Sequence, residues 1–198
     1  IRCHPFVLAE LQAAGLEDER AAVTAFDRAL FGHIGFSISN FFRALWLGLS
    51  NSAFSASPYA DATAKYYKQM NRYSAALALM SDVAMGTMGG DLKRRERISA
   101  RLGDMLSMLY LTSAVLKRFN DDGRPAQDLP LVQWACEDNM YKAQVALDEM
   151  LDNFPNRIVG SVLGKLLFPW GRTLRKASDQ LDHQVSRIMQ TPCAVSYT

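Results

Sequence analysis

The chain has 198 residues, of which 49% are hydrophobic and 21% are charged, and this balance excludes a chain that is disordered throughout. Its formal net charge of +2 is too small to indicate a nucleic-acid-binding protein. The three cysteines, Cys3, Cys136 and Cys193, are an odd number and lie far apart in the sequence, so we expect reduced thiols in a reducing compartment rather than a disulfide framework.

The first part of the chain predicts helices followed by a loop. Pro5 suits the first turn of a short helix, and residues 17–31 predict a second one. From Leu30, apolar residues recur every three or four positions as far as Leu49, which is the spacing of a continuous stripe along one helix face. Residues 51–58 have the composition of a loop.

The rest of the chain predicts long helices joined by short polar turns. Asp61 is a good N-cap for the first of them, which we expect to end or kink at Gly86 and at the pair Gly89-Gly90. Asp91 can cap the next helix. Further helices are predicted over residues 131–151, 157–168 and 178–189. No segment shows the period-two alternation of a strand, so the sequence predicts an all-α, antiparallel helical bundle.

The sequence offers no residue that we assign to catalysis, to a cofactor or to a metal. Carboxylates on neighbouring helices can bind metal ions in a helical bundle, but those sites use a Glu-x-x-His motif, which does not occur here. Glycine-rich phosphate loops and the Gly-x-Ser-x-Gly elbow do not occur either. The carboxylates on predicted helices with charged neighbours are Glu96, Glu137, Asp138, Asp148 and Glu149.

A dense basic cluster lies at the expected start of the helix after Asp91. Cations in a first turn oppose the helix dipole, so something acidic should offset them. One interpretation is a salt-bridge network to Asp82 or to carboxylates within residues 137–148; the other is an anion site for a coenzyme A phosphate, a lipid headgroup or an acidic partner. The cluster comprises Lys93, Arg94, Arg95, Arg97 and Arg101.

Two segments have the pattern of helices that lie on a membrane surface. Residues 29–49 are rich in aromatic side chains and carry few charges, and residues 157–175 place cations around an apolar helix that a tryptophan follows. Both stripes could instead be bundle core. The predicted membrane contacts are Phe31, Ile34, Ile38, Phe41, Phe42, Leu45, Trp46, Leu167, Phe168 and Trp170.

Several stretches resemble the C-terminal helical region of bacterial FadE-type, long-chain acyl-coenzyme A dehydrogenases. The resemblance runs in the same order through nearly the whole chain, and its most specific part is the run from Lys93 to Asp104. The stretches are Ile1-Arg2-Cys3-His4-Pro5, residues 89–104, 109–111, 114–118, 128–132, 153–157 and Leu181-Asp182-His183.

The resemblance implies a part of an FAD-dependent oxidoreductase that oxidises the Cα–Cβ bond of fatty-acyl-coenzyme A in β-oxidation. In such enzymes a glutamate removes the α-proton and the flavin accepts the β-hydride. The glutamate lies upstream of the Ile-Arg-Cys-His-Pro segment, so we expect the base and the flavin domain outside this chain, no FAD in it, and a fragment that is inactive alone.

The region is also similar in layout to the extra C-terminal domain of very-long-chain acyl-coenzyme A dehydrogenases. This implies that residues 1–58 end the dehydrogenase helical region and include a membrane-contact segment, and that residues 59–198 form the C-terminal bundle. The expected partners are the upstream catalytic domains, a second copy of the chain and the cytoplasmic face of the inner membrane, without metal or nucleic acid. The alternative is a stand-alone helical-bundle interaction protein without enzymatic activity.

Overall fold

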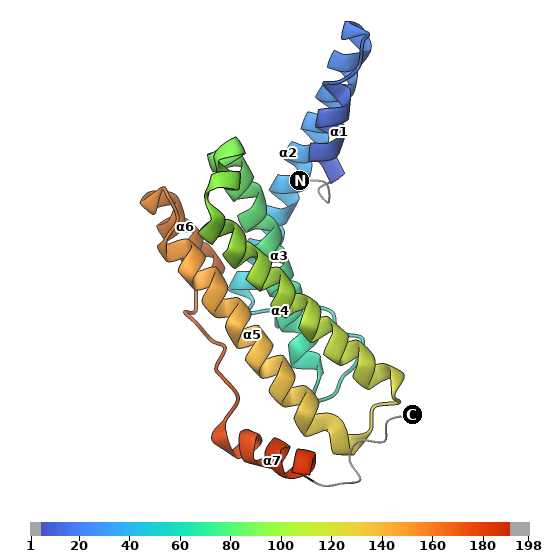
Figure 1. Cartoon of the computed structure of the whole chain (residues 1–198), viewed down its shortest axis with the longest axis vertical. Helices are drawn as coiled ribbons and strands as arrows, with labels where there is room; N and C mark the ends of the chain where they lie inside the picture. Colours follow the sequence, from blue (N-terminus) through green and yellow to red (C-terminus); the bar gives the residue numbers. More distant parts are fainter. Residues whose placement is uncertain (1–4, 191–198) are drawn as a thin grey trace. The chain divides into compact units, whose positions relative to one another are not determined.

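The computed structural model describes residues 5–190, and in this range the chain forms helices and no strand (Figure 1). This confirms the all-α prediction. The predicted helical segments 17–31 and 29–49 form one helix, which begins at Glu19, two residues after the predicted start. The α-helices are α1 (Pro5–Ala13), α2 (Glu19–Leu49), α3 (Ala64–Met88), α4 (Glu96–Asp121), α5 (Leu129–Asp152), α6 (Arg157–Leu167) and α7 (Asp179–Gln190), with the 3₁₀ helices η1 (Gly89–Arg94) and η2 (Ala126–Asp128).

The chain divides into two compact units, Ile1–Arg43 and Ala44–Thr198. In the first unit, Phe6 of α1 packs on α2, where its ring stacks on His33 with centroids 6.3 Å apart. Gly32 allows this contact, because a Cβ there would collide with the Phe6 ring. The predicted division into residues 1–58 and 59–198 stays a prediction.

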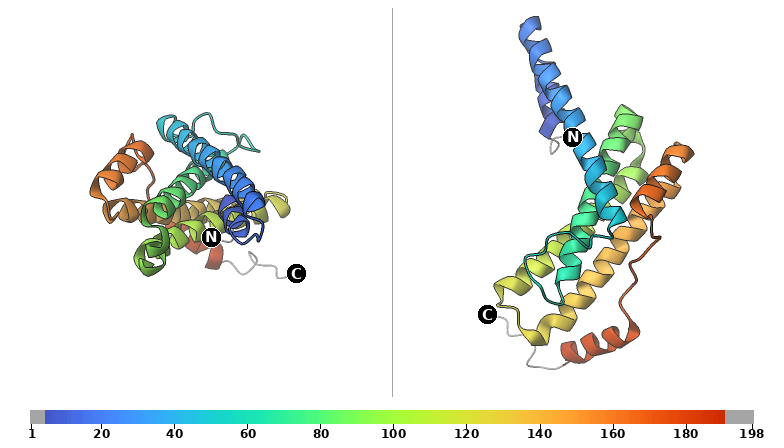
Figure 2. Two further views of the ribbon diagram at one scale, coloured as in Figure 1. Left: turned by 90° about the horizontal axis from the view of Figure 1, so that it is seen from above. Right: turned by 180° about the vertical axis from the view of Figure 1, so that it is seen from behind.

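The second unit is built on α3, α4 and α5, which run antiparallel to one another in sequence order (Figures 1 and 2). Its main core is rich in methionine, an unbranched side chain that fills irregular gaps between helices. A smaller core at the other end of the bundle surrounds Tyr66 and Cys136. The methionines at 1% exposure or less are Met80, Met105, Met140 and Met150.

Helix α6 folds back after residues 153–156 and packs closely on its neighbours. A Cβ on Gly160 would lie 2.6 Å from the carbonyl oxygen of Leu151 in α5, and one on Gly48 would lie 2.9 Å from that of Leu166. Both glycines therefore let backbones approach in a way that larger residues would prevent. The ends of α2 and α6 meet through this second contact.

The structure corrects two predicted helix caps. Asp61 accepts hydrogen bonds from the backbone and the hydroxyl of Thr63, at 2.9 and 2.6 Å, and Thr63 itself is the N-cap of α3. Asp91 lies within η1, and α4 begins at Glu96 after Arg95 as its N-cap. The 3₁₀ turn between α3 and α4 separates Asp91 from the helix it was expected to cap.

Candidate functional site

Three carboxylates of α5 are held by neighbouring cations, and one of them is also held by a buried hydroxyl. Glu137 Oε1 accepts hydrogen bonds from Lys65 Nζ and from the Tyr66 hydroxyl, both at 2.9 Å. Asp138 pairs with Lys142, and Asp148 pairs with Arg172. These three acidic residues therefore have structural partners within the helical bundle. Within residues 5–190, no group of three or more metal-ligating side chains comes together.

Cys136 is fully buried in the smaller core. Desolvation by burial, followed by the charge of Glu137, raises the pKa of its thiol to about 12. Because the thiolate is the reactive form of cysteine, this side chain packs as a small apolar group. Cys3 and Cys193 lie outside the described residues.

Helix α2 carries an exposed apolar surface along the predicted stripe, and we call this set the α2 surface. Phe31 is 70% exposed. Residues 28–60 contain no Asp or Glu, whereas Arg28 and Arg43 are exposed beside the stripe. The chain therefore presents aromatic and cationic groups together with no acidic ones. The α2 surface consists of Phe31, Ile34, Ile38, Phe41, Phe42 and Trp46, which are exposed, and Leu45, which is half-buried.

The predicted membrane contact of Leu167 and Phe168 is wrong. Both side chains are buried in the main core, because the face of α6 that contains Leu163 and Leu167 packs on the bundle. The opposite face leaves Ile158 exposed. Trp170 is 67% exposed, and its indole N–H donates to the carbonyl oxygen of Leu49 at 2.8 Å.

The basic cluster is mostly unpaired. Arg101 pairs with Glu149 of α5 at 3.2 Å, so the salt-bridge interpretation holds for this residue. It is wrong for the other four, which are exposed and form no ion pair in the part of the chain that the structure describes. Lys93 and Arg94 lie in η1 and Arg95 precedes α4, so these three cations are not in the first turn of α4, where the helix dipole was expected to oppose them. These four are Lys93, Arg94, Arg95 and Arg97.

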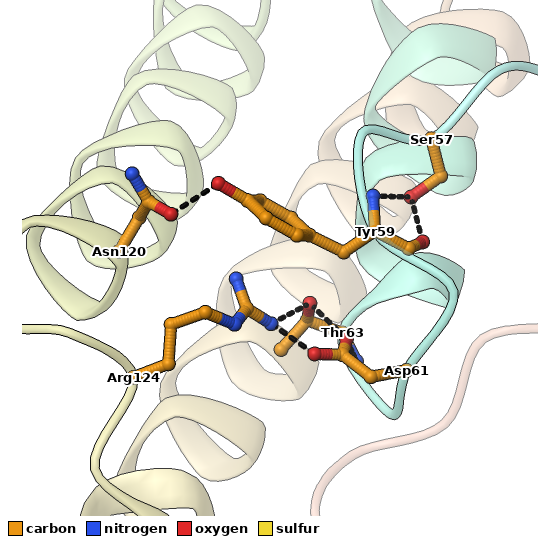
Figure 3. A network of polar contacts seen from close by, with 6 residues as sticks. All are labelled: Ser57, Tyr59, Asp61, Thr63, Asn120 and Arg124. Atoms are coloured by element: carbon orange, nitrogen blue, oxygen red, sulfur yellow. Dashed lines mark hydrogen bonds and ion pairs between the residues drawn. The ribbon is translucent and has the colours of Figure 1, made fainter.

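A polar network fastens the loop before α3 to the turn between α4 and α5 (Figure 3). The guanidinium of Arg124 bonds to Asp61 and to the Thr63 hydroxyl, and it lies 3.8 Å above the ring of Tyr59. The Tyr59 hydroxyl donates to Asn120 at the end of α4. We interpret this network of Tyr59, Asp61, Thr63, Asn120 and Arg124 as a structural clamp and call it the Arg124 clamp.

A pocket between α3 and two loops contains a buried cation, Arg72, whose hydrogen-bond partners are neutral. Arg72 is 5% exposed, and its guanidinium donates to Asn51 Oδ1 at 2.5 Å and to the carbonyl oxygen of Leu167 at 2.8 Å. We call this space the Arg72 pocket. It has a volume of about 260 Å³ and is lined by Asn51, Ser52, Ala53, Lys65, Lys68, Gln69, Arg72, Thr173 and Leu174.

The sequence alone does not predict this pocket, although it shows the cationic helix face that forms one of its walls. Lys65, Lys68 and Arg72 are spaced three and four residues apart, which places them on one face of a helix. The loop residues that complete the pocket come from two other segments, so their contribution could not be read from spacing.

Comparison with known families gives a match that covers almost the whole chain. Residues 1–197 match the family described as acyl-CoA dehydrogenase, C-terminal, bacterial type. No solved structure matches the chain. None of the helices in residues 5–190 has the length and hydrophobicity that a membrane-spanning segment needs.

Proposed function

Because this chain belongs to the bacterial-type C-terminal family of acyl-CoA dehydrogenases, we propose that it is an accessory region that holds such an enzyme on a lipid surface. The enzyme would oxidise fatty-acyl-coenzyme A with FAD as the electron acceptor, as the first step of a β-oxidation cycle. We assign the flavin and the catalytic base to other domains of the enzyme; in this chain Glu137, Asp138 and Asp148 of α5 are engaged in ion pairs.

The α2 surface is the observation that carries the proposal. An isolated exposed apolar residue is ordinary, but a continuous apolar stripe on one helix indicates an interaction surface. Aromatic side chains suit the interface between headgroups and acyl chains. The absence of acidic residues from positions 28–60, together with Arg28 and Arg43, favours an anionic lipid leaflet as the occupant.

The bundle formed by α3, α4 and α5 supports a scaffolding role in the same proposal. Its two cores and the Arg124 clamp give the second unit its own packed interior, which can anchor the α2 surface to the catalytic domains of the same enzyme. The cytoplasmic face of the inner membrane and contact between two copies of the chain belong to this proposal.

Vesicle co-sedimentation of the full chain tests the docking function. We expect Phe31→Asp to weaken binding to mixed phosphatidylcholine–phosphatidylglycerol vesicles by about tenfold to a hundredfold, the effect of removing one buried phenylalanine. Tyr110→Asp is the matched control, because Tyr110 on α4 is also 70% exposed but lies outside the α2 surface. Equal binding of the two variants would reject the role of this surface.

The alternative is a helical-bundle interaction protein without a link to flavin chemistry. The two functions differ in their partner: the proposed one requires the chain to co-purify with flavin-containing catalytic domains when it is expressed with them. A chain that leaves those domains in the soluble fraction and binds no vesicles would favour the alternative.

A further inference from the structure

We propose that the Arg72 pocket binds the phosphate of an anionic lipid headgroup. This inference rests on the proposed docking function and assigns it a specific polar contact. The pocket lies entirely within the second unit, between α3, the 51–53 turn and the segment at Thr173 and Leu174. Its volume of about 260 Å³ is below the range of about 300–1,000 Å³ typical of small-molecule sites, so it suits a headgroup rather than a whole coenzyme.

The charge of the pocket is positive and lacks an acidic partner for two of its three cations. Arg72 bonds to two neutral oxygens, and Lys68 Nζ donates to the carbonyl oxygen of Ala53 at 2.9 Å. The remaining cation, Lys65, is paired with Glu137. None of the lining residues is acidic. A buried cation is costly unless an anion pairs with it, so the pocket calls for an anionic ligand.

The pKa of Arg72 agrees with this geometry. Burial lowers the pKa of the guanidinium, and the nearby Tyr73 offsets part of that effect. An arginine nonetheless stays protonated in proteins. Its two hydrogen bonds tie the 51–53 turn to the end of α6, so Arg72 also has a structural role and is unsuitable as the first position to mutate.

Ser52 provides a second, independent feature that points to a ligand. This residue is 2% exposed, lines the same pocket, and its hydroxyl oxygen has no hydrogen-bond partner among the described residues. Buried hydroxyl groups are nearly always hydrogen-bonded. A phosphate oxygen can accept from a hydroxyl group, and Lys68 and Arg72 line the same pocket, so an anion there would meet one unsatisfied donor and two cations.

The surroundings of the turn favour a lipid as the source of the phosphate. Phe54 directly follows the turn and is 79% exposed, and its ring stacks with that of Trp46 at 6.1 Å. The exposed Trp170 is bonded to the backbone of Leu49 just before the turn. A phosphate in the pocket would therefore lie beside exposed aromatic rings, which is how phosphate and acyl chain are arranged in a phospholipid.

The test uses the full chain with vesicles of phosphatidylcholine alone and of phosphatidylcholine mixed with phosphatidic acid. The double variant Ser52→Ala/Lys68→Gln leaves Arg72 in place. We expect it to melt at the wild-type temperature and to lose about tenfold in affinity for the mixed vesicles, as for one charge-assisted contact. Its affinity for phosphatidylcholine alone should not change.

Lys93→Gln is the matched control, because it removes the same charge from an exposed site outside the pocket. If it weakens binding to the mixed vesicles as much as the double variant does, the effect is general electrostatics and the pocket assignment is overturned. If the wild-type chain binds neither kind of vesicle, the docking function itself fails, and the lipid assignment fails with it.

A soluble arm distinguishes a lipid from a free phosphate. Glycerol 1-phosphate and inorganic phosphate are titrated into the wild-type chain and the double variant while the melting temperature is followed. If a soluble phosphate raises the melting temperature of the wild type alone and the vesicles show no dependence on Ser52 and Lys68, the site takes a soluble ligand. That result would overturn the lipid assignment.

Discussion

At the scale of single residues, Gly160 shows how closely α6 approaches α5. A methyl group at this position would lie 2.6 Å from a backbone oxygen and 3.0 Å from Phe154 Cβ. We expect Gly160→Ala to lower the free energy of unfolding by about 1–3 kcal/mol, the usual cost of overpacking. Gly164→Ala is the control: with nothing within 4 Å of its Cβ, it should be neutral or stabilising by up to about 1 kcal/mol.

Urea unfolding followed by circular dichroism measures both glycine variants. Equal stabilities of Gly160→Ala and Gly164→Ala would show that α6 does not approach the backbone of α5 this closely at Gly160.

Asp61 gives the Arg124 clamp a dependence on pH. The hydrogen bond from the Thr63 hydroxyl lowers the pKa of Asp61, opposed in part by desolvation, and Arg124 lowers it further. Because the folded pKa is below the unfolded value of about 3.9, the group stabilises the fold above about pH 4, and this contribution is lost as the pH falls through the folded pKa. Asp61 is largely exposed, so the effect should stay below about 1 kcal/mol.

The variant Asp61→Asn isolates this contribution. The loss of unfolding free energy between neutral and acidic pH should be smaller in the variant than in the wild type, as measured by urea titrations at several pH values. Parallel curves for the two proteins would contradict the assignment.

At the scale of elements, the sequence predicts the helices well and their ends less well. Regular spacing of apolar residues identified α2 to α5, because a buried stripe must recur every three or four residues. The start of α4 was missed because the backbone of Gly89, with φ +50°, ends α3 and a 3₁₀ turn follows. The burial of Leu167 was missed because the same amphipathic pattern is typical of a helix on a membrane surface and of a helix that packs on a bundle.

Asn156 determines where α6 begins. Its side-chain oxygen accepts hydrogen bonds from the backbone N–H groups of Ile158 and Val159, at 3.0 and 3.3 Å. We expect Asn156→Ala to destabilise the protein by about 1 kcal/mol, whereas Asn156→Asp should retain the cap. Thermal unfolding of the two variants measures this difference, and equal losses would argue against a capping role.

At the scale of the whole molecule, the α2 surface could be predicted from the sequence and the Arg72 pocket could not. The surface lies on one helix, so the periodicity of its apolar residues, its aromatic side chains and its few charges were enough to predict it. The pocket needs a helix face, a turn at Ser52 with φ +61° and a segment about a hundred residues further along the chain. Such a site depends on tertiary packing that neither spacing nor composition encodes directly.

Depth-dependent quenching of tryptophan fluorescence tests the docking claim most directly. Trp46 is 59% exposed on the α2 surface, whereas Trp134 is half-buried and bonded to Asp182 of α7. Two variants of the full chain, Trp134→Phe/Trp170→Phe and Trp46→Phe/Trp170→Phe, retain one of these residues each. With anionic vesicles whose acyl chains are brominated, the emission of Trp46 should be strongly quenched and that of Trp134 should not. Emission from Trp46 that is unchanged by the brominated lipid would contradict a membrane-docking role for this chain.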